Sequence, residues 1–259
     1  MADLPPTADD GATEAVVVRH IELENALNFR DVGGYPTADG RRVRWRRLFR
    51  AGGLSQLTPT DLVALRELGI ATVLDLRSTA EWQEGRFPVD EMPVAYHHLP
   101  IVEEILDPTR YDLPEGMLAA RYQDYTRIGA TNIARALSVV AEPEGHPIVV
   151  HCLAGKDRTG VIIALVLGLL GVDDDTVAED YSLSNLAMGK LRERAEAMAN
   201  PSRPVRDPAV SAEVFSAKPS NITSLFAALR ASHGSVEDYV VSIGVKPDAI
   251  EALRDSLLE

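Results

Sequence analysis

Residues 147–170 read PIVVHCLAGKDRTGVIIALVLGLL, and this stretch decides which fold the chain can adopt. It begins with Ile148-Val149-Val150, a β-branched run typical of a central strand in a parallel sheet. It ends with the apolar residues 159–170, which have the length and character of a buried helix. A short polar loop joins the two. A strand, a tight loop and a helix in this order predict an α/β fold with a mostly parallel central sheet.

Strand and helix patterns also alternate before this stretch. Thr58 and Pro59 begin a helix that Gly69 ends, because a hydroxyl caps the start, proline suits the first turn and glycine suits the end. Residues 70–76 then predict a buried strand, and residues 94–99 predict another. The alternation favours a sheet flanked by helices.

Helical patterns dominate elsewhere. Residues 116–142 predict a helix interrupted near Gly129, and residues 176–199 predict one with a break near Gly189. Residues 200–220 contain four prolines and predict a loop or hinge, because proline interrupts helices and strands.

The two ends of the chain differ in character. Residues 1–14 are polar, acidic and proline-bearing, which predicts a disordered tail. Ser235 and Pro247 begin the last two short helices. We expect residues 15–259 to form a single domain.

The composition limits the classes of function. The chain has 259 residues, of which 46% are apolar and 25% charged, as in ordinary globular proteins. Its net charge of −13 argues against nucleic acid as a partner, because phosphate backbones need a basic face. No basic segment followed by an apolar one begins the chain, and the longest apolar run, 161–170, is shorter than the ~20 residues that span a bilayer. We expect a cytoplasmic protein that does not span a membrane, with export without a leader left open.

The loop after the central strand carries the residues expected to do chemistry. Cys152 is the only cysteine, so its thiol is either an inert core group or reserved for a reaction. Loops between the carboxyl end of a strand and a helix N-terminus bind anions, and such positions favour the thiolate form of a cysteine. Gly155 lets the backbone curl so that successive N–H groups converge. Arg158 offers a planar fork of donors that matches two phosphate oxygens.

Phosphoryl transfer mainly requires positioning and charge stabilisation, which this loop can supply. We therefore predict Cys152 as nucleophile and Arg158 as phosphate clamp, with the Thr159 hydroxyl donating to the thiolate or to the incoming water. His151 would anchor the loop by hydrogen bonding. The residues that would line the phosphate site are Leu153, Ala154, Gly155 and Lys156. A nucleotide-binding P-loop is excluded, because Val150 and Asp157 stand where that motif needs glycine and Ser or Thr.

The pattern His-Cys, five residues, then Arg-Thr-Gly at 151–160 resembles the signature loop of the cysteine-dependent protein tyrosine phosphatase superfamily. Residues 154–160 (AGKDRTG) and 28–31 (NFRD) resemble one branch more closely, the lid-covered bacterial enzymes typified by protein tyrosine phosphatase B. Residues 48–50 and 74–78 are similar to two further landmarks of that branch. The resemblance implies the tyrosine phosphatase fold, a phosphocysteine intermediate, no metal, no cofactor and a two-helix lid within residues 181–220.

The resemblance also implies the substrates. They are phosphotyrosine proteins, with phosphoserine, phosphothreonine or phosphoinositides as further candidates. Lys156 is shared with phosphatases that act on inositol lipids and would add positive charge for a polyanion; otherwise it is a solvated loop lysine. A phosphoinositide phosphatase and a phosphate-binding pseudophosphatase are the alternatives. A rhodanese-like sulfur carrier would not need Arg158 and Thr159.

The general acid has two candidates. Many tyrosine phosphatases protonate the leaving phenolate with an aspartate of a Trp-Pro-Asp loop, but Trp45 and Trp82 are not followed by Pro-Asp here. Asp157, inside the loop, is the first choice, as in the resembled branch. Asp75, at the end of a predicted strand, is the second, and its alternative is an ion pair with Arg77.

Six arginines lie within residues 41–50 and alternate with Val43, Trp45 and Leu48. This alternation predicts a hairpin or edge strand with a solvated basic face. The basic face would either attract acidic substrates to the mouth of the site or serve solvation alone.

Overall fold

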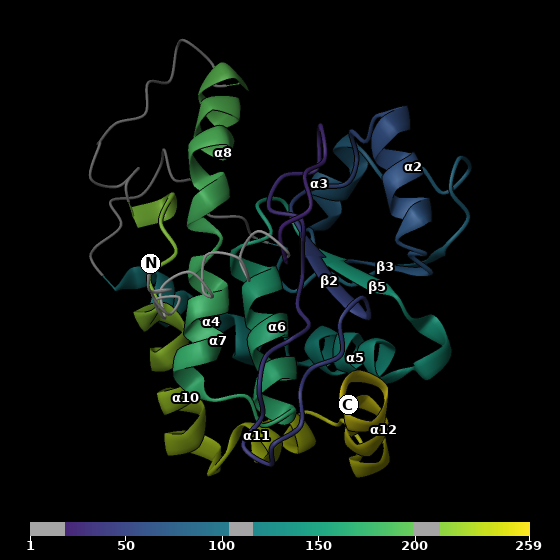
Figure 1. Ribbon diagram of the computed structural model, residues 1–259. Helices are drawn as coiled ribbons and strands as arrows, with labels where there is room; N and C mark the ends of the chain where they lie inside the picture. Colours follow the sequence, from purple (N-terminus) through teal and green to yellow (C-terminus); the bar gives the residue numbers. More distant parts are fainter. Residues whose placement is uncertain (1–18, 104–115, 199–212) are drawn as a thin grey trace, which may run out of the picture.

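The structure, a computed structural model, describes residues 19–103, 116–198 and 213–259 (Figure 1). A five-stranded sheet with the order β1-β2-β5-β3-β4 lies at its centre. Its strands are β1 (Arg30–Asp31), β2 (Leu48–Ala51), β5 (Ile148–His151), β3 (Thr72–Asp75) and β4 (Ala95–His98). Only β1 runs antiparallel to its neighbour; the other pairs are parallel. The predicted mostly parallel sheet is therefore confirmed.

Both faces of the sheet centre are covered, as the buried apolar residues of β3 and β5 require. Successive residues of one strand point to opposite faces, and Val149 and Val150 accordingly belong to different hydrophobic clusters. On the face of Val149 lie α2 (Pro59–Glu67) and its residues Leu62 and Leu65. On the face of Val150 lies the apolar helix α6 (Asp157–Leu169), whose residues 161–167 are almost completely buried.

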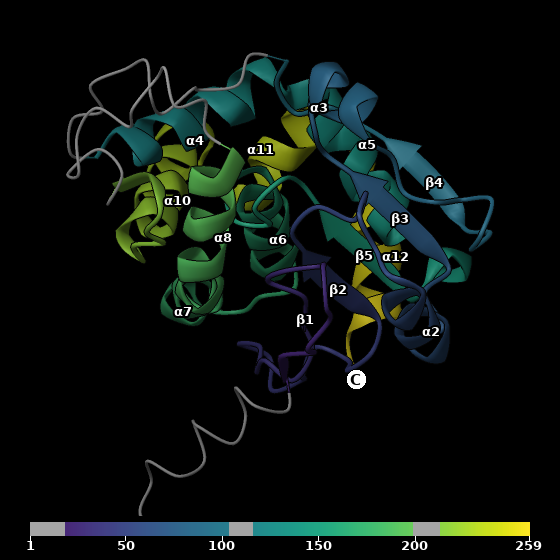
Figure 2. The ribbon, with the colours of Figure 1, turned by 90° about the horizontal axis from the view of Figure 1, so that it is seen from above.

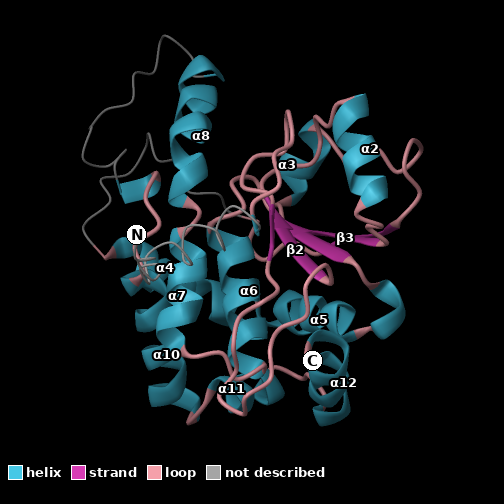
Figure 3. Cartoon of the chain, viewed as in Figure 1, coloured by secondary structure: helices cyan, strands magenta, loops and turns pink. Residues whose placement is uncertain are grey.

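Most of the remaining helices extend the layer around α6, whereas α3 lies on the same side of the sheet as α2 (Figure 1). Figure 2 shows α4, α6, α7, α8 and α10 grouped on one side of the sheet. Their bounds are α3 (Thr79–Glu84), α4 (Met117–Ile128), α5 (Ala130–Ala141), the short 3-10 helix η1 (Pro143–Gly145), α7 (Asp174–Ser182), α8 (Asn185–Met198), α10 (Ser220–His233), α11 (Val236–Ser242) and α12 (Pro247–Leu257). α8 projects from this layer (Figure 3). Within the three described ranges, none of the helices has the length and apolar character needed to cross a bilayer.

Helix boundaries test the sequence predictions. The predicted interruption at Gly129 is confirmed, since α4 ends before it and α5 begins after it. A Cβ at Gly129 would lie 2.6 Å from the Ile101 carbonyl oxygen, so glycine is needed there. The predicted break at Gly189 is wrong, because α8 continues through it. A helical glycine costs only about 1 kcal/mol relative to alanine and does not by itself end a helix.

The prediction for the arginine-rich stretch holds in its first part only. Residues 41–43 pair antiparallel with residues 35–37, as in a hairpin, and Arg41 and Arg42 are exposed. Residues 48–51 differ from the prediction. All four residues of β2 are buried, and β2 lies between β1 and β5, so it is an inner strand without a solvated face. β2 runs parallel to β5, with Leu48 beside Ile148 and Ala51 beside His151. Residues 41–47 precede the amino end of β2, whereas Cys152 follows the carboxyl end of β5, so this basic face does not lie at the mouth of the site.

Three predictions fall partly or wholly on undescribed residues, and one of them is the loop or hinge at 200–220, of which the structure describes residues 213–220. The tail at 1–14 lies outside the described residues. Of the predicted lid at 181–220, residues 199–212 lie outside them too.

Candidate active site

The loop that joins β5 to α6 is held by the ends of the neighbouring strands. The last residues of β2, β3 and β5 lie side by side, so the carboxyl ends of these strands meet at one side of the sheet. These residues are Ala51, Asp75 and His151. Gly155 has φ +66°, and a Cβ on it would lie 2.3 Å from the Ala51 carbonyl oxygen. Glycine is thus required twice, for its left-handed backbone and for the close approach to β2.

Three successive carbonyls of the loop are bonded on its outer side. Leu153 O accepts from the Gly53 N–H at 2.9 Å, and Ala154 O accepts from the Asn28 side-chain amide at 3.1 Å. Gly155 O accepts from Asn28 at 3.1 Å and from Arg50 Nη2 at 2.8 Å. Because N–H and C=O point in opposite directions in a trans peptide, the following N–H groups face the other side. This arrangement is typical of an anion-binding nest, and we expect such a nest at the start of α6.

A buried cluster of ionised side chains around Asp180 lies against the outer side of the loop. Asp180 of α7 accepts from Arg50 Nη1 at 2.6 Å, from Arg30 Nε at 3.3 Å and from the Tyr35 hydroxyl at 3.0 Å. Burial alone would raise the pKa of the Asp180 carboxyl, but Arg30 and Arg50 hold it well below its usual range. Burial and the charge of Arg50 lower the pKa of Arg30 to about 10. Two arginines against one carboxylate leave positive charge behind the nest.

Arg158 is aligned by a partner that the sequence reasoning missed. Glu81 of α3 accepts from both Nη atoms of Arg158, with 2.8 Å between Nη2 and Oε1. Burial alone would raise the pKa of Glu81, but the hydrogen bond and charge of Arg158 lower it. Ser78 and Glu81 also form a capping box at the start of α3, and the spacing Ser-x-x-Glu could have revealed both this helix and this residue.

Cys152 lies at the base of the nest with 1% of its surface exposed. His151 is buried beside it, with Nδ1 3.3 Å from the Cys152 carbonyl oxygen, in keeping with the anchoring role predicted for it. Burial lowers the pKa of His151 and so favours the neutral ring. The Thr159 hydroxyl is buried and has no hydrogen-bond partner among the described residues, Cys152 included. The predicted bond to the sulfur is therefore not seen, and donation to the incoming water stays a prediction.

The two candidate acids lie in different surroundings. Asp75 is fully buried and accepts from Arg77 Nη2 and the Tyr96 hydroxyl, each at 2.7 Å. Burial alone would raise its pKa, but His151, Arg77 and Tyr96 together hold it well below its usual range. This geometry favours the alternative interpretation of Asp75, an ion pair with Arg77. Asp157 instead keeps 26% of its side chain exposed.

Lys156 is not a solvated loop lysine. The residue is 1% exposed, and its ammonium donates to the carbonyls of Val214 and Ser216, the latter at 3.0 Å. It thereby ties the loop to the chain that follows the undescribed residues 199–212. Contact of Lys156 with a substrate stays a prediction.

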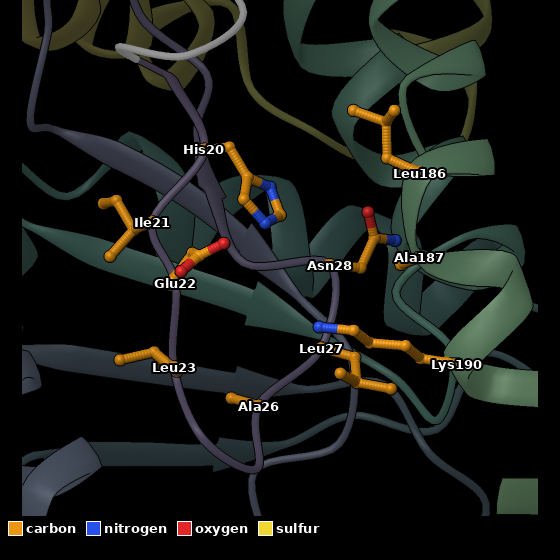
Figure 4. Close-up of a pocket in the computed structure, with 10 residues that line it drawn as sticks. All are labelled: His20, Ile21, Glu22, Leu23, Ala26, Leu27, Asn28, Leu186, Ala187 and Lys190. Carbon is orange, nitrogen blue, oxygen red and sulfur yellow. The ribbon is translucent and has the colours of Figure 1, made fainter.

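A pocket next to the loop lies between residues 20–28 and α8 (Figure 4). Its lining includes His20, Asn28, Leu186 and Lys190, but none of residues 151–158. Asn28 therefore separates this pocket from the nest.

A sequence model of the tyrosine phosphatase family matches residues 21–259. The chain belongs to the tyrosine phosphatase family. It is 36% identical over 211 residues to the triple specificity protein phosphatase PtpB of Mycobacterium tuberculosis, covering 68% of this chain and 73% of that protein. It is 31% identical over 239 residues to a putative tyrosine-protein phosphatase of Cupriavidus necator, covering 88% and 86%.

Among solved structures, this tyrosine phosphatase is similar to the Siw14 catalytic core, at 16% identity and a TM-score of 0.39, over 76% of this chain and 97% of that one. The family and the two relatives confirm the predicted superfamily and its protein tyrosine phosphatase B-like branch. The protein is accordingly a hydrolase of the protein-tyrosine-phosphatase type.

Proposed function

We propose that the enzyme hydrolyses phosphotyrosine through a phosphocysteine at Cys152. In the first step the thiolate sulfur attacks phosphorus, the bond from phosphorus to the phenolic oxygen breaks, and Asp157 gives its proton to that oxygen. In the second step water attacks phosphorus, the S–P bond breaks, and the Asp157 carboxylate takes a proton from the water. Inorganic phosphate leaves, and the thiolate and the acid are restored.

One observation carries this proposal: the buried Cys152 begins a loop whose carbonyls are already bonded, and Arg158 of the same loop is aligned by Glu81. Glu81 uses one proton on each Nη of Arg158, so the remaining N–H groups of this five-donor fork can bind phosphate oxygens. The nest and Arg158 would stabilise the charge that spreads over the equatorial oxygens in the transition state.

Substitution of Cys152 by serine tests the nucleophile. We expect nearly complete loss of turnover on 4-nitrophenyl phosphate, with the unfolding temperature close to that of the parent protein. A ³²P-labelled substrate should leave acid-stable label on the parent protein after rapid quenching, but none on Cys152→Ser. Turnover by Cys152→Ser at the parent rate would refute the proposal, and a parent protein that binds phosphate without turnover would be a pseudophosphatase.

The substrate class follows from two features. Leu153 is 55% exposed beside the nest, which offers an apolar contact for an aromatic ring. The relative from Mycobacterium tuberculosis is named a triple specificity phosphatase, and this supports further substrates beside phosphotyrosine. Inositol lipids are the second candidate, because Lys156 could serve a polyanion if its ammonium left Val214 and Ser216. Parallel turnover of phosphotyrosine peptides and phosphoinositide vesicles by the parent and by Lys156→Met separates the two.

A lid formed by α8 belongs to the same proposal. Ala187 and Met188 of α8 pack against Leu27, and Arg194 Nη1 donates to the Asn25 carbonyl at 3.0 Å. These contacts support a helix fastened next to Asn28, at the rim of the nest. A lid in this position would exclude water from the reaction and gate substrate entry.

A further inference from the structure

A chain of hydrogen bonds leads from α10 through α7 and α4 to Asp157. The Tyr122 hydroxyl of α4 lies 2.6 Å from Asp157 Oδ1 and 2.7 Å from the Tyr181 hydroxyl of α7. The Asn221 side-chain amide of α10 donates to the Tyr181 hydroxyl at 3.3 Å. Tyr122 is completely buried, so water does not compete for its hydroxyl.

Counting protons fixes the direction of this chain. A tyrosine hydroxyl has one proton, and an ionised carboxylate can only accept. Tyr122 therefore donates to Asp157, Tyr181 donates to Tyr122, and Asn221 donates to Tyr181. Burial and the charge of Asp157 raise the pKa of Tyr122 well above its ordinary value, so it stays a donor at neutral pH.

We propose that Tyr122 is a positioning residue for the general acid, holding Oδ1 of Asp157 so that Oδ2 carries the transferable proton. The inference rests on the proposed role of Asp157. The Lys156 ammonium also lies on the Oδ1 side, at 3.5 Å. Oδ2 receives no hydrogen bond from the residues that the structure describes. A proton on the acid therefore sits on Oδ2, because donors already occupy Oδ1.

The same bond stabilises the product of the proton transfer. Once Asp157 has protonated the leaving group it is a carboxylate, and a hydrogen bond to an ionised acceptor is about twice as strong as a neutral one. The Tyr181–Tyr122 bond polarises the Tyr122 hydroxyl and strengthens it as a donor. Tyr122 thus supplies a donor to the carboxylate that proton transfer leaves behind, without touching the substrate.

Packing makes the donor rigid. Gly160 of α6 faces the Tyr181 ring, and a Cβ there would lie 3.0 Å from Tyr181 Cδ2. The glycine lets this ring approach α6 closely enough for its hydroxyl to reach Tyr122. The rings of Tyr122 and Tyr181 meet edge to face, with centroids 6.0 Å apart.

Tyr122→Phe removes only the hydroxyl and is the main test variant. The readout is the dependence of kcat/KM on the leaving-group acidity of aryl phosphates, because an acid matters most for poor leaving groups. We expect a loss of about 10- to 100-fold on phenyl phosphate, as for a lost hydrogen bond to a charged group, and a much smaller loss on 4-nitrophenyl phosphate. Tyr181→Phe should shift the slope in the same direction by less.

Tyr239→Phe is the matched control. It also removes a buried hydroxyl that bonds to α4, at 2.8 Å from the Thr126 carbonyl oxygen, but it does not contact Asp157. It should lower the unfolding temperature without changing the slope. Asp157→Asn provides the reference, and Tyr122→Phe should add little in that background.

The outcomes separate the two proposals. The slope is the dependence of log kcat/KM on the pKa of the leaving group. Suppose that Asp157→Asn makes this slope steeper, while Tyr122→Phe and Tyr181→Phe keep the parent slope and lose only stability. Tyr122 is then structural and the inference is overturned. If Asp157→Asn itself keeps the parent slope, the proposed acid is wrong and the inference falls with it. Steeper slopes for Asp157→Asn and Tyr122→Phe, with the parent slope for Tyr239→Phe, support it.

Discussion

Replacing Gly155 with alanine should cost both activity and stability. The new Cβ would lie 2.3 Å from the Ala51 carbonyl oxygen, and real Cβ atoms essentially never approach within 3.0 Å of such an atom. The loop must therefore retreat from β2 by about 0.7 Å. Its left-handed backbone costs an alanine a further 1–2 kcal/mol, roughly.

The displacement acts directly on the phosphate site, because Gly155 O is also the acceptor for Arg50 and Asn28. A misplacement of about 1 Å can reduce turnover on the order of 10²-fold. We therefore expect kcat/KM on 4-nitrophenyl phosphate to fall about 10²-fold, and the free energy of unfolding to fall by more than the roughly 1–2 kcal/mol of the backbone strain alone. Steady-state kinetics and urea unfolding measure the two quantities.

Gly69→Ala supplies the control. Gly69 also has a left-handed backbone, at φ +73°, but no atom lies within 4 Å of an added Cβ. It follows α2, at the other edge of the sheet from Cys152. The control should lose only the roughly 1–2 kcal/mol of the backbone strain and keep its activity. If Gly155→Ala has the same kcat/KM as Gly69→Ala, the contact with β2 does not shape the phosphate site.

Three further predictions concern the surroundings of the loop. Glu81→Gln removes the charge that aligns Arg158 and should lower kcat/KM about tenfold or more. The control is Glu103→Gln, which weakens contacts to Thr79 at the start of α3 and should leave kcat/KM unchanged. Equal kcat/KM of the two variants would show that Glu81 does not align Arg158 for catalysis. Asp180→Asn should cost several kcal/mol near neutral pH, because it leaves buried arginines uncompensated. The pKa of Asp180 is lower in the folded protein than in the unfolded chain, where it is about 3.9. The parent protein is therefore more stable than Asp180→Asn above this pH, and the difference in free energy of unfolding shrinks as the pH falls below it. A difference, measured by urea unfolding, that stays constant from pH 7 to pH 3 would contradict this. A lid should slow labelling of Cys152 by a bulky maleimide relative to a small one, and equal rates would argue against it.

Local sequence predicted the elements whose signals lie close together in the chain. The β-branched run, the glycine and the apolar helix within 147–170 gave the sheet centre and the loop. The Thr58-Pro59 cap and the break at Gly129 were read correctly for the same reason.

The residues that hold the loop in place could not be predicted from nearby sequence. Asp180 lies 130 residues from Arg50 and 150 from Arg30, so no spacing rule connects them. Arg50 looked like part of a solvated alternation, and only its buried partner explains an arginine inside β2. Glu81 differs, because its capping-box spacing with Ser78 is a local signal in the sequence.

The link between Asn28 and the Ala154 carbonyl spans 126 residues, which means that the phosphate cradle forms only when distant parts of the chain have come together. An oxyanion that binds at this site will bind the folded protein and will not bind partly folded forms. Inorganic phosphate should then stabilise the whole molecule by mass action, with a midpoint of unfolding that rises with ligand concentration. Ligand affinity would in this way report the completeness of folding.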